Sequence, residues 1–136
     1  MEFHRGRVFD HVHLRARNLE ASKKFYRAVL KALDRDKGIS EADDHFSADE
    51  LWIDQADGAT SQIHLAFQAR DQEQVKAFHA AALAAGGRDN GKPGERNYHP
   101  GYYAAFAFDP DGNNIEATYH GPFTASAESV ILKPKT

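Results

Sequence analysis

Cysteine is absent from the 136-residue chain. The protein therefore has no disulfide framework, and any metal site must be built from nitrogen and oxygen ligands instead of thiolates. The sequence also lacks an uninterrupted apolar run long enough to cross a membrane, and its first residues, MEFHRGRVFD, lack the hydrophobic centre of a secretory signal. We therefore expect a soluble, cytoplasmic protein.

A positive charge excess is missing as well. The chain has 17 Lys and Arg residues against 20 Asp and Glu residues, which gives a net charge of −3. This balance argues against binding to nucleic acid or to an anionic membrane surface. The hydrophobic content of 41% and the charged content of 27% are ordinary for a globular protein, and the length suits one domain. The eight histidines are the one compositional sign of chemistry.

The chain contains an internal repeat with a constant offset of 53 residues. The segment HVHLRARNLEASKKFYRAVL aligns with HLAFQARDQEQVKAFHAAAL, so that His11 corresponds to His64 and Phe25 to Phe78. Because the same offset holds through a predicted strand, a helix cap and a helix, we interpret it as a duplication. In each half an alternating strand precedes a helix, for which Asn18 and Asp71 are the expected N-caps.

Short strands are expected after each helix, near residues 36–40, 43–48 and 50–55 in the first half and near 88–92, 102–109 and 113–120 in the second. Each half is thus a β-α-β-β-β module, and the fold class is α+β, with two tandem modules that form a concave mixed sheet. We expect a single domain. Its parts are module 1, about residues 7–58; module 2, about 59–120; and a C-terminal tail, 121–136.

Strand alternation places a set of metal-binding side chains on one face of this sheet. In the first strand Val8, Val12 and Leu14 would face the helix, so that His11 points to the opposite, concave face. His64 occupies the same place in the second module, and Glu116 follows it there if Ile115 packs under the helix. Two imidazoles and one carboxylate suit a divalent ion of Fe, Mn, Ni, Co or Zn, with coordination positions left open for a substrate. The sequence leaves open whether Asp54, preceded by isoleucine as Glu116 is, adds a fourth ligand.

The segments DHVHLRARNLEASKKFYRAVL, IHLAFQA and AFDPDGNNIEATYH resemble the glyoxalase / bleomycin resistance / extradiol dioxygenase superfamily, the vicinal oxygen chelate fold, over roughly residues 7–120. The resemblance implies that His11, His64 and Glu116 bind the metal, and that Asp54 stands where glyoxalase I has its fourth ligand. It also implies a homodimer whose site lies within one chain or is shared between two.

The resemblance leads us to expect a metal-dependent lyase or isomerase, glyoxalase-like, that acts on a small oxygenated substrate. Two alternatives stay open: an extradiol-type dioxygenase with Fe at the same ligands, and a metal-free drug-binding protein of the bleomycin resistance kind. In each case the expected partners are a small molecule and a second copy of the chain, with no nucleic acid and no membrane.

Residues 92–101 have no counterpart in the first half and are expected to be an inserted loop, and the segment KPGERNYHPGYY that contains them is predicted to be a lid over the site. We expect Glu116, His99 and Tyr103 to be catalytic. The residues expected to bind substrate are Arg96, Tyr98, Tyr102, Trp52 and His13. The alternative interpretation of the lid is a loop packed by its own aromatic side chains.

Overall fold

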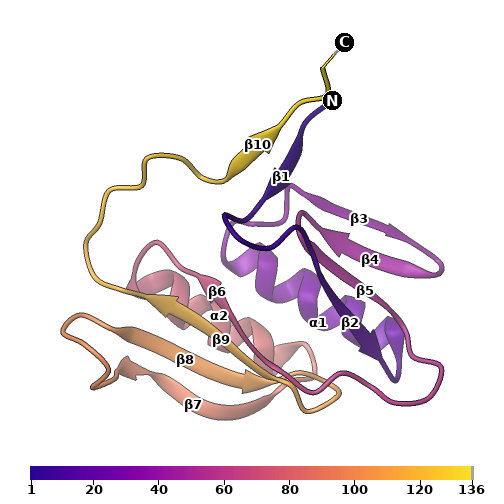
Figure 1. Cartoon of the computed structure of the whole chain (residues 1–136). Coiled ribbons are helices and arrows are strands. Elements are labelled where there is room, and N and C mark those ends of the chain that lie inside the picture. Colours follow the sequence, from indigo (N-terminus) through magenta and orange to yellow (C-terminus); the bar gives the residue numbers. More distant parts are fainter. Residues whose placement is uncertain (136) are drawn as a thin grey trace.

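The computed structural model describes residues 1–135. In chain order, their helices and strands are β1 (Phe3–Arg5), β2 (Val12–Ala16), α1 (Leu19–Ala32), β3 (Ile39–Ala42), β4 (His45–Ala48), β5 (Leu51–Gln55), β6 (His64–Gln68), α2 (Gln72–Ala84), β7 (Arg88–Glu95), β8 (Tyr103–Phe108), β9 (Asn114–Tyr119) and β10 (Val130–Leu132). Each repeat therefore forms one β-α-β-β-β unit, and the α+β fold with tandem modules is confirmed (Figure 1).

Each module has its own four-stranded mixed sheet. The strand orders are β2-β5-β4-β3 and β6-β9-β8-β7. The first strand of each module runs parallel to the last one, β2 to β5 and β6 to β9, and the other pairs are antiparallel. As a result β2 and β6 are edge strands, each paired on one side only.

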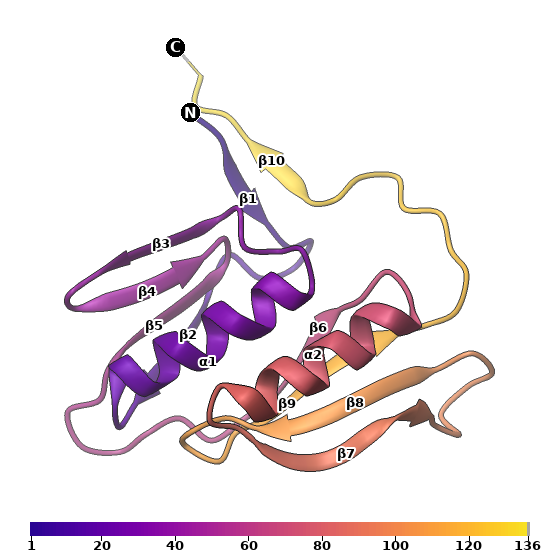
Figure 2. The same ribbon diagram turned by 180° about the vertical axis from the view of Figure 1, so that it is seen from behind.

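The two helices begin where the sequence predicts. The Asn18 side chain accepts a hydrogen bond from the Ala21 amide, and the Asp71 side chain accepts one from the Gln74 amide, so both helices have ordinary N-caps. The helices contact each other and lie on one side of the two sheets, as Figure 2 shows from behind. Within residues 1–135, no helix covers the opposite sheet faces, which are seen from the front in Figure 1.

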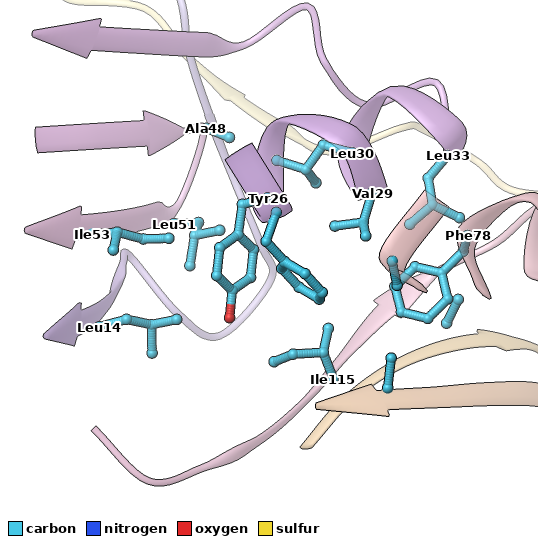
Figure 3. Close-up of a cluster of buried hydrophobic side chains, with 14 of the residues drawn as sticks. Leu14, Tyr26, Val29, Leu30, Leu33, Ala48, Leu51, Ile53, Phe78 and Ile115 are labelled. Atoms are coloured by element: carbon cyan, nitrogen blue, oxygen red, sulfur yellow. The ribbon is translucent and has the colours of Figure 1, made fainter. Parts of the chain in front are cut away.

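The hydrophobic core lies between the helices and the inner sheet faces. Figure 3 shows Tyr26 of α1 among Leu14 and Ile53 of the first sheet, with Ile115 of the second sheet nearby. The Tyr26 hydroxyl donates a 2.6 Å hydrogen bond to Asp109, which lies in the turn between β8 and β9. Asp109 also accepts hydrogen bonds from the amides of Asp111 and Asn113. This buried bond ties the first module to the turn that leads into β9.

We predict that Tyr26→Phe destabilises the fold by about 1–2 kcal/mol, because it removes one donor from the buried Asp109 carboxylate and leaves the others in place. Urea unfolding at a fixed protein concentration measures the effect. Tyr98→Phe, which changes an exposed tyrosine, is the matched control and should leave the free energy of unfolding unchanged. Equal stability of the two variants would contradict the role given to Tyr26.

Several boundaries differ from those predicted, and β3, for example, spans Ile39–Ala42 and not residues 36–40. The first sheet strand begins at Val12, and Val8 is 84% exposed, so the alternation read from Val8 onward does not describe a strand there. Strand β7 extends to Glu95, four residues into the predicted insert. In the C-terminal tail, β10 pairs with β1 as a separate two-stranded ribbon, and residue 136 lies outside the described residues. Among residues 1–135, no helix has the length and hydrophobicity that crossing a membrane requires.

Candidate functional site

A histidine and a glutamate meet on the uncovered face of the second sheet. His64 is the first residue of β6, and Glu116 lies in the neighbouring parallel strand β9. The register pairs Ala66 with Glu116, so His64, two residues earlier, points to the same face. Nε2 of His64 lies 2.7 Å from Oε1 of Glu116, and the His64 side chain is 54% exposed. The structure thus brings together two of the three metal ligands predicted from the sequence.

The carboxylate of Glu116 is almost completely buried, at 2% exposure, and both of its oxygens have partners. Its Oε2 atom accepts hydrogen bonds from the Tyr102 hydroxyl and, at 2.6 Å, from the Thr118 hydroxyl. Burial, followed by the hydrogen bond to Glu116, raises the pKa of Tyr102, so the hydroxyl stays protonated and able to donate. Three polar groups therefore offset the loss of water around this buried carboxylate.

Aromatic and cationic side chains border the pair. Phe106 of β8 lies directly across from Glu116, and its ring centroid is 6.0 Å from that of His64. The Arg96 guanidinium carbon lies 5.3 Å from the Phe106 centroid. Its Nη atoms donate to the backbone carbonyls of Lys92, Gly94 and Glu95, which hold the guanidinium in place beside the site.

The predicted lid packs around Tyr102. The Tyr98 ring stands nearly perpendicular to the Tyr102 ring, with centroids 4.9 Å apart. His99 and His120 also contact the Tyr102 ring, and Nε2 of His99 lies 2.8 Å from Nδ1 of His120. These contacts show the aromatic packing that one interpretation expected, and the role of the segment as a lid stays a prediction.

Tyr103, predicted to be catalytic, lies on the other side of the sheet. It pairs with Tyr119, and it is 9% exposed within the hydrophobic core. Side chains of a strand alternate between faces, so Phe106 and Ala104 of β8 lie on the face of Glu116. Tyr102, the residue directly before β8, lies on that face as well. The structure does not bring Tyr103 to Glu116, and Tyr102 occupies the place expected for it.

His11, the third predicted ligand, is not near His64 and Glu116 within one chain. It precedes β2, its side chain is 65% exposed, and its Nδ1 lies 2.7 Å from Oδ1 of Asp10. Across residues 1–135, no three His, Asp or Glu side chains gather closely enough to hold a metal ion. A single chain therefore presents a two-residue half-site at His64 and Glu116.

The first sheet carries a different polar group on its uncovered face. Oδ1 of Asp54 lies 2.9 Å from Nε2 of His13 and 2.9 Å from Nε of Arg15. Trp52 shares this face, and its ring stacks on that of His45 with centroids 4.3 Å apart and planes 9° apart. These neighbours place the predicted substrate-binding residues Trp52 and His13 together, away from the half-site.

The register also changes the expected match between Asp54 and Glu116. Glu116 pairs with the residue two positions after His64, whereas the residue two positions after His11 is His13, which pairs with Trp52. Trp52 is therefore the structural counterpart of Glu116. Asp54, paired with Arg15, is the counterpart of Thr118. Coordination of a metal by Asp54 stays a prediction without support from the repeat.

Sequence reasoning gave no role to Thr118, Phe106 and His120. Alternation along β9 was sufficient to place Thr118 and His120 on the face of Glu116. That Phe106 lies opposite Glu116 required the register between β8 and β9, which follows from the tight turn at residues 109–113.

Chemically, the half-site offers an imidazole nitrogen and a carboxylate oxygen to the same point. Their separation of 2.7 Å allows both atoms to bind one ion. Nitrogen and oxygen donors of this kind suit Fe, Mn, Ni, Co or Zn, and a site with three protein ligands leaves positions open for substrate oxygens. The donor types therefore fit a divalent metal, and the number of donors from one chain falls short of three.

Comparison with known proteins indicates one family, both from the sequence and from the fold. The model of the Glyoxalase/Bleomycin resistance protein/Dioxygenase superfamily matches residues 8–117. A glyoxalase/bleomycin resistance protein from Albidiferax ferrireducens is 34% identical, with 82% of this chain and 97% of that chain covered and a TM-score of 0.69. No curated protein matches the sequence significantly.

Two more distant structures share the fold. A glyoxalase-related enzyme from Fulvimarina pelagi is 17% identical, with a TM-score of 0.70 and coverage of 95% of this chain and 99% of that one. A lactoylglutathione lyase from Agrobacterium tumefaciens is 21% identical, with a TM-score of 0.59 and coverage of 84% and 94%.

Proposed function

The chain belongs to the Glyoxalase/Bleomycin resistance protein/Dioxygenase superfamily, and from this premise we propose that it is a metal-dependent lyase or isomerase of the vicinal oxygen chelate type. The observation that carries the proposal is the pairing of His64 with the buried Glu116 on an uncovered sheet face. A carboxylate is expensive to bury, and strands hold its position rigidly, as a metal ligand requires.

We propose that the metal site is shared between two copies of the chain in a homodimer. His64 and Glu116 come from one copy, and His11 comes from the other. The exposed His11 and the unpaired edges of β2 and β6 support this arrangement, because a second copy can approach both. The uncovered faces of the two sheets would then enclose a cavity between them, lined by Trp52 and His13 from the copy that supplies His11.

Each residue near the half-site has a part in this proposal. A divalent ion would supply Lewis acidity to neighbouring oxygens of a small substrate. Tyr102 and Thr118 orient the Glu116 carboxylate through its Oε2 atom and leave Oε1 toward His64. Among the described residues Nε of Arg96 has no hydrogen-bond partner, so this edge of the fixed guanidinium can bind an anionic group of the substrate.

A second candidate is a metal-free binding protein of the bleomycin resistance kind. It is favoured by the grouping of only two of the three proposed ligands within residues 1–135. In that case the cavity between two copies would hold the ligand by its aromatic side chains, Trp52 and Phe106 among them.

Metal analysis of protein purified without chelator distinguishes the two candidates. The proposed enzyme retains about one divalent ion per chain. Glutathione with methylglyoxal then tests for the lactoylglutathione lyase activity named for a distant relative, and oxygen uptake with catechols tests for a dioxygenase. Metal-free protein that gains no metal on incubation with Co²⁺, Zn²⁺, Fe²⁺, Mn²⁺ or Ni²⁺ would reject the enzyme and favour the binding protein.

We predict that Tyr102→Phe lowers the affinity for Co²⁺ about tenfold, because the carboxylate of Glu116 loses one of the donors that orient it. Titration of the metal-free protein with Co²⁺, followed by visible absorption, measures the change. Tyr98→Phe keeps the neighbouring ring and should bind Co²⁺ as the wild type does. Unchanged affinity in Tyr102→Phe would show that its hydroxyl does not tune the site.

A further inference from the structure

We propose that His99 and His120, which we call the histidine clamp, hold the Tyr102 hydroxyl on Glu116, so that His120 is a positioning residue of the site. The significance of the clamp for metal binding depends on the proposed function, whereas its geometry and its effect on Tyr102 do not.

The clamp joins two segments that are distant in sequence. His99 lies in the loop between β7 and β8, and His120 directly follows the last residue of β9. Their ring nitrogens are 2.8 Å apart, their centroids are 5.1 Å apart and their planes differ by 18°. The rings therefore lie edge to edge in nearly one plane, which is the arrangement of a ring-to-ring hydrogen bond and not of face-to-face stacking.

The partners of His99 determine where the protons are. Nδ1 of His99 lies 2.8 Å from the Pro100 carbonyl, and a carbonyl oxygen only accepts, so this nitrogen carries the proton. In a neutral His99 the other nitrogen, Nε2, must then accept. Nδ1 of His120 is therefore the donor to it. The geometry assigns the Nδ1–H form to both neutral histidines.

The Tyr102 ring is held by this pair. Its plane is at 79° to His99 and 85° to His120, with centroids 5.3 Å and 5.2 Å away. The Tyr102 amide also donates to the His99 carbonyl, and the Arg96 amide donates to the Tyr102 carbonyl, which closes the loop on itself. These contacts hold both the ring and the backbone of Tyr102 while its hydroxyl donates to Glu116 and lies 3.5 Å from the Thr118 hydroxyl.

Both ring nitrogens of His99 form hydrogen bonds within the protein, to the Pro100 carbonyl and to His120. His99 is therefore assigned a structural role here instead of the predicted role of proton donor to the substrate. The His120 ring packs against the Tyr102 ring. Among the described residues, His120 makes no hydrogen bond to Glu116. The sequence feature that carries the inference is the spacing of His120 four residues after Glu116, which places it directly beyond β9 on the side to which Glu116 points.

The test compares His120→Asn with His120→Leu. Asparagine places an N–H near the position of Nδ1 and can still donate to His99, whereas leucine has similar bulk and no donor. Long-range ¹⁵N–¹H spectra at about pH 9, where histidines are ordinarily neutral, report which nitrogen carries each proton. The ring signals of Tyr102, assigned by their loss in Tyr102→Phe, report the position of the ring. Neither measurement needs metal or substrate.

We expect Nδ1–H forms of His99 and His120 in the wild type. In His120→Leu the Tyr102 ring signals should move toward those of an exposed tyrosine, and Co²⁺ affinity should fall about tenfold, whereas His120→Asn should resemble the wild type in both. An Nε2–H form of either histidine, or unchanged Tyr102 signals in His120→Leu, would overturn the clamp. If the Tyr102 signals move but the wild type binds no metal, the clamp is supported and the proposed function fails.

Discussion

Glu116→Gln is expected to lower metal affinity by at least about 100-fold. Loss of a residue that only hydrogen-bonds to a metal ligand costs up to about 100-fold, and here the ligand itself is lost. Glutamine has nearly the same shape, and its amide oxygen can still accept from Tyr102 and Thr118. It lacks the negative charge that attracts a divalent ion. The loss should therefore reflect coordination and not a collapse of the pocket.

Thermal unfolding with and without added Zn²⁺ measures this loss of metal affinity. A ligand present at 100 times its dissociation constant stabilises the native state by about 2.7 kcal/mol. The wild type should show this stabilisation at such a concentration, and Glu116→Gln, with at least a 100-fold higher dissociation constant, should show about 0.4 kcal/mol or less. The matched control is Thr118→Val, which removes one hydrogen bond to the carboxylate and should weaken binding only by the smaller factor of an outer partner. Equal stabilisation of wild type and Glu116→Gln would exclude Glu116 as a ligand.

His11→Ala is expected to reduce metal affinity as strongly as His64→Ala, although His11 is not grouped with His64 and Glu116 in its own chain. The reason is that a second copy would place its His11 beside the pair, and losing one ligand of three leaves an incomplete site. Isothermal titration of each metal-free variant with Co²⁺ measures the effect.

His13→Ala is the control for this prediction. His13 is a neighbouring histidine on the face of the first sheet, and its nearest charged partner is Asp54. It should retain metal affinity close to that of the wild type. Wild-type affinity in His11→Ala would limit the site to His64, Glu116 and their immediate neighbours, and would remove the need for a second copy.

Local patterns predicted the elements well because each depends on residues close in sequence. Asn18 and Asp71 cap the helices as expected, since an N-cap needs only its own side chain and the amides one turn ahead. The 53-residue repeat then implied that both halves share one topology, which the two sheet orders confirm.

Errors arose where the outcome depends on pairing between strands. Isoleucine precedes both Asp54 and Glu116, and this local similarity suggested that they correspond, yet the strand register makes Trp52 the counterpart of Glu116. The start of β2 at Val12 depends on the length of its partner β5, which begins at Leu51. Neither fact is visible in the alternation of the first strand alone.

The choice between the two adjacent tyrosines shows the same limit. Alternation correctly separated Tyr102 from Tyr103, but deciding which of them meets Glu116 requires the pairing of β8 with β9. Tyr103 pairs with Tyr119 on the helix-covered face, so Tyr102 is the one that reaches the carboxylate. In the proposed dimer the placement of His11 relative to His64 would depend on how a second copy docks, which no pattern within one chain predicts.

Mixing two variants that each bind metal weakly tests most directly whether the site is shared between two chains. In a heterodimer of His11→Ala with Glu116→Ala, one site combines both substitutions and the other combines the intact His11 of one chain with the intact His64 and Glu116 of its partner. After random exchange of subunits, about a quarter of all sites should regain metal affinity, although neither variant alone binds tightly. Recovery of that fraction in a Co²⁺ titration is the predicted result. No recovery, with exchange verified by mass spectrometry of the mixed dimer, would contradict a site built from two chains.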